Sequence, residues 1–168
     1  MITSILDPEV APEDRIIGSG DPDIKCVFLT PSETEFRRAE AILRATPISL
    51  HHAATLEQAE FQLARIEAGV LMTELQFPDG DWEDAIEMLS HSYPRVLLVL
   101  AAAQADERLW IRALERGAFD LVSKPFQTEE LRRILENADA HSKMLGSGEA
   151  RVSQEPPADP GGSSAGSG

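Results

Sequence analysis

The sequence predicts an α/β fold in which a doubly wound, five-stranded parallel sheet is covered by helices on both faces. Short apolar runs alternate with helical patterns five times in about 120 residues. The runs are continuous rather than alternating, most clearly at Val96–Leu100, which is typical of parallel strands buried on both sides. With 168 residues and 42% hydrophobic content, the chain can bury one ordinary core.

The elements follow from apolar runs and from end signals. We expect the strands at Lys25–Leu29, Ile48–His52, Val70–Thr73, Arg95–Ala101 and Phe119–Val122. The first helix has two competing capping boxes, one beginning at Thr30 and one at Ser32. Three further residues of N-cap type precede later helices: Thr55, Asp81 and Thr128. Two glycines are placed where left-handed C-terminal caps are common: Gly69 and Gly117.

The two ends differ in composition from the middle. Residues 1–24 contain three prolines and scattered acids without an apolar period, so we expect a mostly disordered arm. Residues 146–168 are rich in Gly, Ser and Pro and predict a flexible tail. The predicted domain is therefore 25–145.

Charge and cysteine content exclude several classes of function. The formal net charge of −14 argues against nucleic acid as a partner, because phosphate contacts need clustered Lys and Arg. The longest apolar run is too short for a membrane span, and no signal peptide is visible. The single cysteine, Cys26, allows no internal disulfide, and a cytoplasmic location is expected. There is no glycine-rich phosphate loop, and the sequence predicts no cofactor and no metal.

Two motifs carry a family resemblance. Glu74-Leu75-Gln76-Phe77-Pro78 closes the third predicted strand, and Gly117-Ala118-Phe119-Asp120 leads to Lys124-Pro125-Phe126 at the end of the fifth. Together they resemble the receiver domain of bacterial two-component response regulators, over residues 25 to about 143. The resemblance implies a flavodoxin-like (βα)5 fold, a phosphoryl-accepting aspartate at position 74, a magnesium ion and a cis bond before Pro125.

The sequence keeps the lysine of that pattern, Lys124, but departs from it at the phosphoacceptor, the metal ligands and the switch hydroxyl. Glu74 replaces the phosphoacceptor aspartate, and Thr30 and Pro31 stand where two metal-binding acids belong. The switch hydroxyl falls at Ala101 or Ala102. Glu33 and Glu35 are expected to point away from the strand ends or to serve the cap. The phosphoacceptor pocket is therefore predicted to be degenerate, with no catalytic residue.

Glu74 is one methylene longer than aspartate and can reach Lys124. A permanent Glu74–Lys124 ion pair could imitate a phosphorylated state, or it could be a structural pair only, since buried pairs are often near break-even in stability.

A recognition surface is predicted on the face formed by the fourth helix, the last strand and the fifth helix, which in receivers carries dimerisation and partner docking. Ile111 and Leu114 are expected to face the core, with Trp110 half exposed among arginines. The predicted contact residues are Trp110, Arg108, Arg112, Leu121 and Arg132. The other interpretation is that Trp110 completes the core.

These observations favour a non-enzymatic, phosphorylation-independent receiver-like signalling module that acts through protein contact, with a partner or as a homodimer. Two alternatives stay open. One is an atypical receiver that accepts phosphate, at Asp79 or Asp81; the other is a flavodoxin-like small-molecule binder.

Overall fold

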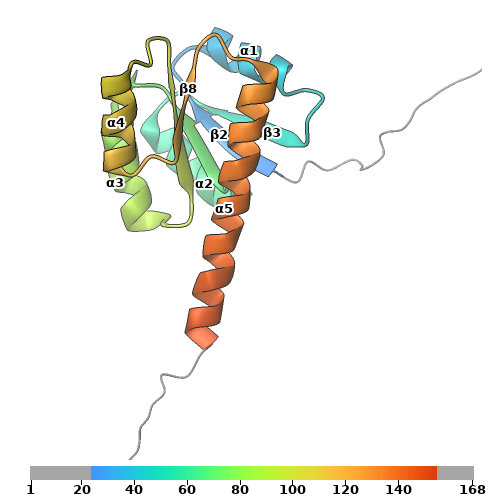
Figure 1. Ribbon diagram of the computed structural model, residues 1–168, viewed down its shortest axis with the longest axis vertical. Helices are drawn as coiled ribbons and strands as arrows, with labels where there is room; N and C mark the ends of the chain where they lie inside the picture. The colour runs from blue at the N-terminus through green and yellow to red at the C-terminus, as the bar shows by residue number, and fades with distance from the viewer. Residues whose placement is uncertain (1–23, 155–168) are drawn as a thin grey trace, which may run out of the picture.

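The computed structural model describes residues 24–154, with side chains for residues 24–146 (Figure 1). Its main sheet has five parallel strands in the order β3-β2-β4-β7-β8. They are β2 (Ile24–Leu29), β3 (Ile48–Ala53), β4 (Val70–Thr73), β7 (Leu97–Ala102) and β8 (Asp120–Ser123). This is the predicted five-stranded, flavodoxin-like sheet, and each strand lies within two residues of its predicted bounds.

Helices cover both faces of the sheet (Figure 1). The helices are α1 (Glu33–Ile42), α2 (Leu56–Ile66), α3 (Trp82–Ser92), α4 (Glu107–Arg116) and α5 (Thr128–Gln154). Two short strands, β5 (Gln76–Phe77) and β6 (Gly80–Asp81), form an antiparallel pair between β4 and α3.

The alternation of side chains along each strand divides the core into two layers. In β2, Cys26 and Phe28 pack with residues of α1 and α5, whereas Val27 and Leu29 pack with residues of α2 and α3. All four are fully buried. A strand covered on both sides needs the continuous apolar sequence from which it was predicted.

The helix starts confirm most of the capping signals. Ser32, not Thr30, caps α1 by accepting a hydrogen bond from the Glu35 N–H. Thr55 caps α2, and Asp81 caps α3 in a complete capping box. Thr128 is the first residue of α5 rather than its cap.

The two glycine predictions had different outcomes. Gly117 ends α4 in the left-handed region with φ 111°, as predicted. At the end of α2, that conformation belongs to Glu67 with φ 55°, so the prediction for Gly69 is wrong. Gly69 instead allows a close approach to α5, because a Cβ there would lie 2.9 Å from the Ser142 Oγ.

The predicted ends of the domain fall partly outside the described residues. Of the predicted arm, only Ile24 is described, and it begins β2. Helix α5 continues to Gln154, past the predicted boundary at 145. Each residue added to an existing helix gains a hydrogen bond without a new nucleation cost, which lets a helix extend through weak formers such as Gly146 and Gly148.

Candidate functional site

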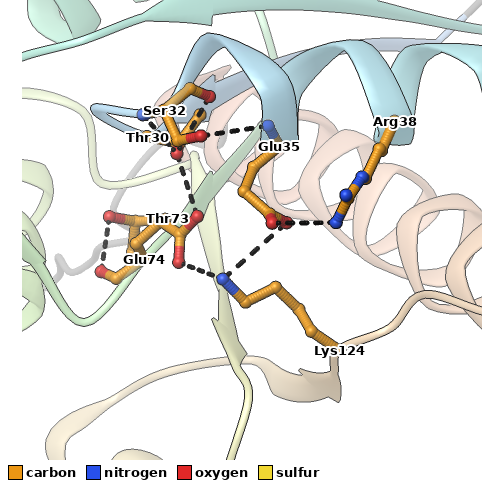
Figure 2. A network of polar contacts seen from close by, with 7 residues as sticks. All are labelled: Thr30, Ser32, Glu35, Arg38, Thr73, Glu74 and Lys124. Carbon is orange, nitrogen blue, oxygen red and sulfur yellow. Dashed lines mark hydrogen bonds and ion pairs between the residues drawn. The ribbon is translucent and has the colours of Figure 1, made fainter.

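The carboxyl ends of β2, β4 and β8 bring together the side chains of the candidate site (Figure 2). Thr30 follows β2, Glu74 follows β4 and Lys124 follows β8. Strands β2 and β4 are neighbours although β3 lies between them in sequence. In doubly wound sheets, ligands bind at such a reversal of strand order. The structure therefore places Thr30, Glu74 and Lys124 where the sequence predicts a site.

Glu74 and Lys124 form a close ion pair. The Lys124 Nζ lies 2.6 Å from the Glu74 Oε1, and the two side chains are only 18% and 15% exposed. The other carboxylate oxygen, Oε2, accepts a hydrogen bond of 2.9 Å from the Thr30 hydroxyl (Figure 2). Both oxygens of Glu74 are thus engaged by groups of the protein itself. The bond between Lys124 and Pro125 is cis, as the resemblance implied.

Thr30 connects this pair to α1 and β3. Its buried hydroxyl accepts a hydrogen bond from the Ser32 N–H at 3.1 Å, while its carbonyl accepts one from the His52 Nε2 at 2.9 Å. The His52 ring stacks on Phe36 with 4.7 Å between ring centroids. Thr30 is therefore buried, its hydroxyl and carbonyl are both hydrogen-bonded, and it fixes the position of the Glu74 carboxylate.

Glu35 is a residue of the site that the sequence reasoning missed. Its Oε1 lies 3.9 Å from the Lys124 Nζ, and its Oε2 lies 3.4 Å from Arg38 (Figure 2). The expectation that Glu35 points away is wrong, because α1 begins after Ser32 and its first turn brings Glu35 over the strand ends. Glu33 does behave as expected and pairs with Arg37 on the exposed side.

The residues at this site do not fit the magnesium ion that receiver chemistry uses. Pro31 offers no carboxylate, the Thr30 hydroxyl is committed to Glu74, and Lys124 already neutralises Glu74. A hard cation needs several converging oxygen ligands. Within the described residues, no group of three or more His, Cys, Asp or Glu side chains is arranged to hold a metal.

The switch hydroxyl also has no counterpart at the end of β7. Ala101 and Ala102 are both buried, and Ala101 belongs to the core layer beneath α1 and α5. The Ala102 carbonyl accepts a hydrogen bond from the Lys124 N–H at 3.0 Å, so this strand end supplies backbone support to the lysine.

The two aspartates considered as alternative phosphate acceptors both serve helix ends. The Asp81 carboxylate accepts hydrogen bonds from the first turn of α3. Asp79 lies in the turn between β5 and β6, and its carboxylate accepts hydrogen bonds from the Leu56 and Glu57 N–H groups at 2.8 and 3.1 Å. Desolvation alone would raise the pKa of Asp79, but these hydrogen bonds outweigh it and lower the pKa below its usual range.

A groove of about 490 Å³ opens beside Lys124 between α1 and the loop after β8. Apolar residues line much of it: Ala41, Ile42, Ala103, Pro125 and Phe126. Glu35, Arg38 and Lys124 stand at its polar side.

The predicted recognition surface is only partly assembled. Ile111 and Leu114 do not face the core; they are 43% and 37% exposed, and Trp110 is 46% exposed. The core contact of α4 comes from the fully buried Ala113 and the partly buried Leu109. The sequence pattern misled because Trp110, Ile111 and Leu114 are exposed although they are large and apolar, whereas the small Ala113 is fully buried.

The arginines lie on the other side of α4. At about 100° per residue, Trp110, Leu114 and Ile111 fall on one side of Ala113, and Arg112 and Arg116 on the opposite side. Both arginines pair with Glu83 at the start of α3, at 2.8 and 3.3 Å.

The other predicted contact residues do not form one surface with Trp110. Leu121 is buried in β8 and cannot reach a partner. Arg132 on α5 pairs with Glu129 and Glu136, and the hydrogen bond with Glu129 raises the pKa of its guanidinium. Arg108 is exposed on α4. We therefore define the α4 apolar face as Trp110, Ile111 and Leu114.

Among the described helices, none combines the length and the hydropathy that crossing a membrane requires.

Two known regulatory proteins are similar in sequence to most of this chain. The chain is 37% identical over 117 residues to the regulatory protein AtoC of Escherichia coli, which covers 68% of this chain and 25% of AtoC. It is 29% identical over 110 residues to the KDP operon transcriptional regulatory protein KdpE of the same organism, covering 65% of this chain and 48% of KdpE. The chain thus spans less than half the length of either relative.

Solved structures share the fold. The signal receiver domain of an HD domain-containing protein from Pseudomonas fluorescens superposes with a TM-score of 0.67 at 22% identity, covering 79% of this chain and 98% of that one. The beryllofluoride-activated NtrC4 receiver domain dimer gives 0.64 at 20%, covering 70% and 98%. The response regulator receiver domain model matches residues 32–136. This chain belongs to the response regulator receiver domain family.

Proposed function

We propose that this receiver domain signals without phosphorylation and without enzymatic activity of its own, by contact with another protein through the α4 apolar face. The observation that carries the proposal is that both carboxylate oxygens of Glu74 already have partners within the protein. One carboxylate oxygen is paired with Lys124 and the other accepts the Thr30 hydroxyl.

Phosphoryl transfer needs a nucleophilic carboxylate and a metal ion that neutralises the developing charge. Glu74 is already neutralised by Lys124, and the positions that would supply metal ligands hold Thr30 and Pro31. Asp79 and Asp81 give little support to the phosphoryl-accepting alternative, because both carboxylates are occupied by backbone N–H groups.

The Glu74–Lys124 ion pair also supports a domain that stays in one conformational state, because the pair is permanent. Here Lys124 lies between Glu74 and Glu35, at 2.6 and 3.9 Å, so negative charge is built into the pocket.

The α4 apolar face supports protein contact as the output. An exposed Trp beside two exposed aliphatic side chains has the composition of an interface centre. Because Arg112 and Arg116 turn toward α3, the apolar side of α4 is directed toward the β8 edge of the sheet. That the related NtrC4 receiver domain forms a dimer supports a second copy of this chain as the partner.

The groove beside Lys124 supports a second candidate, a flavodoxin-like binder of small molecules. Its apolar lining and volume are within the range of ligand sites. Ligand-induced shifts in melting temperature, abolished by Ala41→Trp in the groove, would favour this candidate.

Self-association tests the main proposal. Sedimentation velocity of the full chain should show a dimer whose dissociation constant is unchanged by acetyl phosphate with Mg²⁺. Trp110→Ala should weaken it by about thirtyfold, the effect of losing about 2 kcal/mol at an interface centre. Phe61→Ala is the matched control, because Phe61 is an exposed aromatic on α2. Association that appears only with acetyl phosphate, or that Trp110→Ala leaves intact, would contradict the proposal.

A further inference from the structure

The groove beside Lys124 has an apolar part and a charged part. Glu35, Arg38 and Ile42 line it from one face of α1, because helix residues spaced by three and four share a side. Phe126 lines it from the loop after β8. Glu35 and Arg38 precede Ile42 along the helix, so the charged groups lie toward one end of the groove. A molecule bound there meets apolar side chains along its length and charged side chains at that end.

The apolar part of the groove is fixed by the core beneath it. Phe126 is almost buried, and its ring packs edge-on against Phe28 with 6.1 Å between the ring centroids. Phe28 is fully buried in β2, and Ile42 packs against the same core layer. A surface that is already ordered loses little conformational freedom when a ligand covers it, which favours binding.

The charged groups at the groove balance one another. Arg38 and Lys124 are positive, and Glu35 and Glu74 are negative. Figure 2 shows the Glu35 carboxylate between the two cations, with 3.4 Å to Arg38 and 3.9 Å to Lys124. An anionic ligand would lie against Glu35, and a cationic ligand against Arg38 and Lys124. Because an ion that leaves water needs an uncompensated opposite charge, this balance favours an uncharged molecule.

The two cations have hydrogen-bond donors that the protein does not use. Within the described residues, the Lys124 Nζ makes one hydrogen bond, to Glu74 at 2.6 Å, since the Glu35 oxygen at 3.9 Å is too distant for a second. The Arg38 guanidinium makes one long hydrogen bond to Glu35. An ammonium group has three N–H donors and a guanidinium has five. A ligand that presents a hydrogen-bond acceptor therefore fits these cations better than one that presents a donor.

Building on the small-molecule function proposed above as the second candidate, we infer that this groove binds an uncharged, largely apolar molecule that carries a carbonyl group. The carbonyl oxygen accepts hydrogen bonds from Arg38 and Lys124, and the apolar body lies along Ile42 and Phe126. The volume of about 490 Å³ is sufficient for a ring system of the size of naphthalene.

Prodan, a neutral naphthyl ketone, is a suitable probe because its fluorescence shifts to shorter wavelength when it leaves water. Titration with the full chain should give a saturable shift. The propyl analogue, in which a methylene replaces the carbonyl, should displace prodan with about tenfold lower affinity, the effect of losing a hydrogen bond to a charged donor. The corresponding naphthoate should also bind more weakly, because its carboxylate would lie beside Glu35. Prodan should shift the amide signals of Ile42 and Phe126 and leave those of α4 unchanged.

Variants separate the charged part of the groove from the apolar part. Arg38→Met should weaken prodan about tenfold and leave the affinity of the propyl analogue unchanged. Arg37→Met is the matched control, because Arg37 is paired with Glu33 on the exposed side of α1. Ala41→Trp should abolish the binding of both molecules by filling the groove. Ala140→Trp, at an exposed alanine of α5, should leave the binding of both intact.

The possible failures have different consequences. Equal affinity for prodan and its propyl analogue would overturn the carbonyl requirement, while the small-molecule function would stand. Tighter binding of the naphthoate than of prodan would overturn the preference for an uncharged ligand. Absence of any binding that Ala41→Trp abolishes would overturn both the ligand class and the small-molecule function. Self-association is measured without prodan, so protein contact through the α4 apolar face is tested separately.

Discussion

Lys124 is the residue whose surroundings determine the electrostatics of the site. Glu74 contacts it closely from β4, and Glu35 lies at longer range on α1. Removing one partner of a buried pair leaves a charge without compensation, which costs more than removing the whole pair. The energetic role of the pair can therefore be measured by comparing single and double variants.

We expect Lys124→Met to lower the free energy of unfolding by about 3 kcal/mol, because the Glu74 carboxylate would remain buried without a cation. Lys124→Met combined with Glu74→Gln should be less destabilising than Lys124→Met alone, since Gln can still accept the Thr30 hydroxyl. Urea denaturation measures both. Arg37→Met, in an exposed pair with Glu33, is the control and should cost less than about 1 kcal/mol. Additive effects of the two changes would show that the ions do not interact.

His51 gives the domain a pH dependence. Burial, followed by the charges of Arg65 and Lys25, lowers the pKa of His51 below 6.5. As pH falls below 6.5, the unfolded chain takes up a proton that the folded chain does not, so stability decreases until the lower folded pKa is reached. His51→Gln should flatten the stability curve in this window, measured by urea denaturation from pH 5 to 8. An unchanged slope would contradict the assignment.

At the level of elements, the β5–β6 turn is fastened to α2. Asp79 accepts hydrogen bonds from the first turn of α2, which leaves the neighbouring Thr55 to bond the Gln58 N–H. The helix start is thus capped from two places, one of them 22 residues away in sequence. This contact links the loop after Glu74 to the start of α2.

Asp79→Ala should lower the free energy of unfolding by about 1 kcal/mol, the usual cost of a lost helix cap. Hydrogen exchange should accelerate at Leu56 and Glu57 and remain unchanged in α3. Asp81→Ala is the matched variant and should loosen α3 instead. Equal protection of α2 in both variants would show that Thr55 alone caps the helix.

The sequence predicted elements better than it predicted helix faces. The strands were found because a continuous apolar run buried on both sides has few alternatives. The core face of α4 was missed because burial there depends on Ala113, a small residue that hydrophobicity ranks low, while Trp110 and Ile111 remain exposed. Glu35 was missed because its direction depends on which of two capping boxes starts α1. The long-range cap from Asp79 has no local sequence signal.

The whole molecule has the receiver fold, but the carboxylate at the phosphoacceptor position is bound by Lys124 and Thr30 of the same chain. The sheet order, the cis bond at Pro125 and the lysine at the end of β8 are those expected of the family. The Glu74 carboxylate is paired with Lys124 and accepts the Thr30 hydroxyl, so neither of its oxygens is free to accept a phosphoryl group. We therefore expect this domain to carry no phosphoryl group when it signals.

Intact-protein mass spectrometry after incubation with acetyl phosphate and Mg²⁺ measures directly whether the domain takes up a phosphoryl group. A receiver domain with the full set of acidic residues should be run alongside as a positive control. We expect no added phosphate mass on the wild-type chain, and none on Glu74→Asp, because Thr30 and Pro31 still provide no metal ligands. A magnesium-dependent adduct of phosphate mass on the wild-type chain would contradict it.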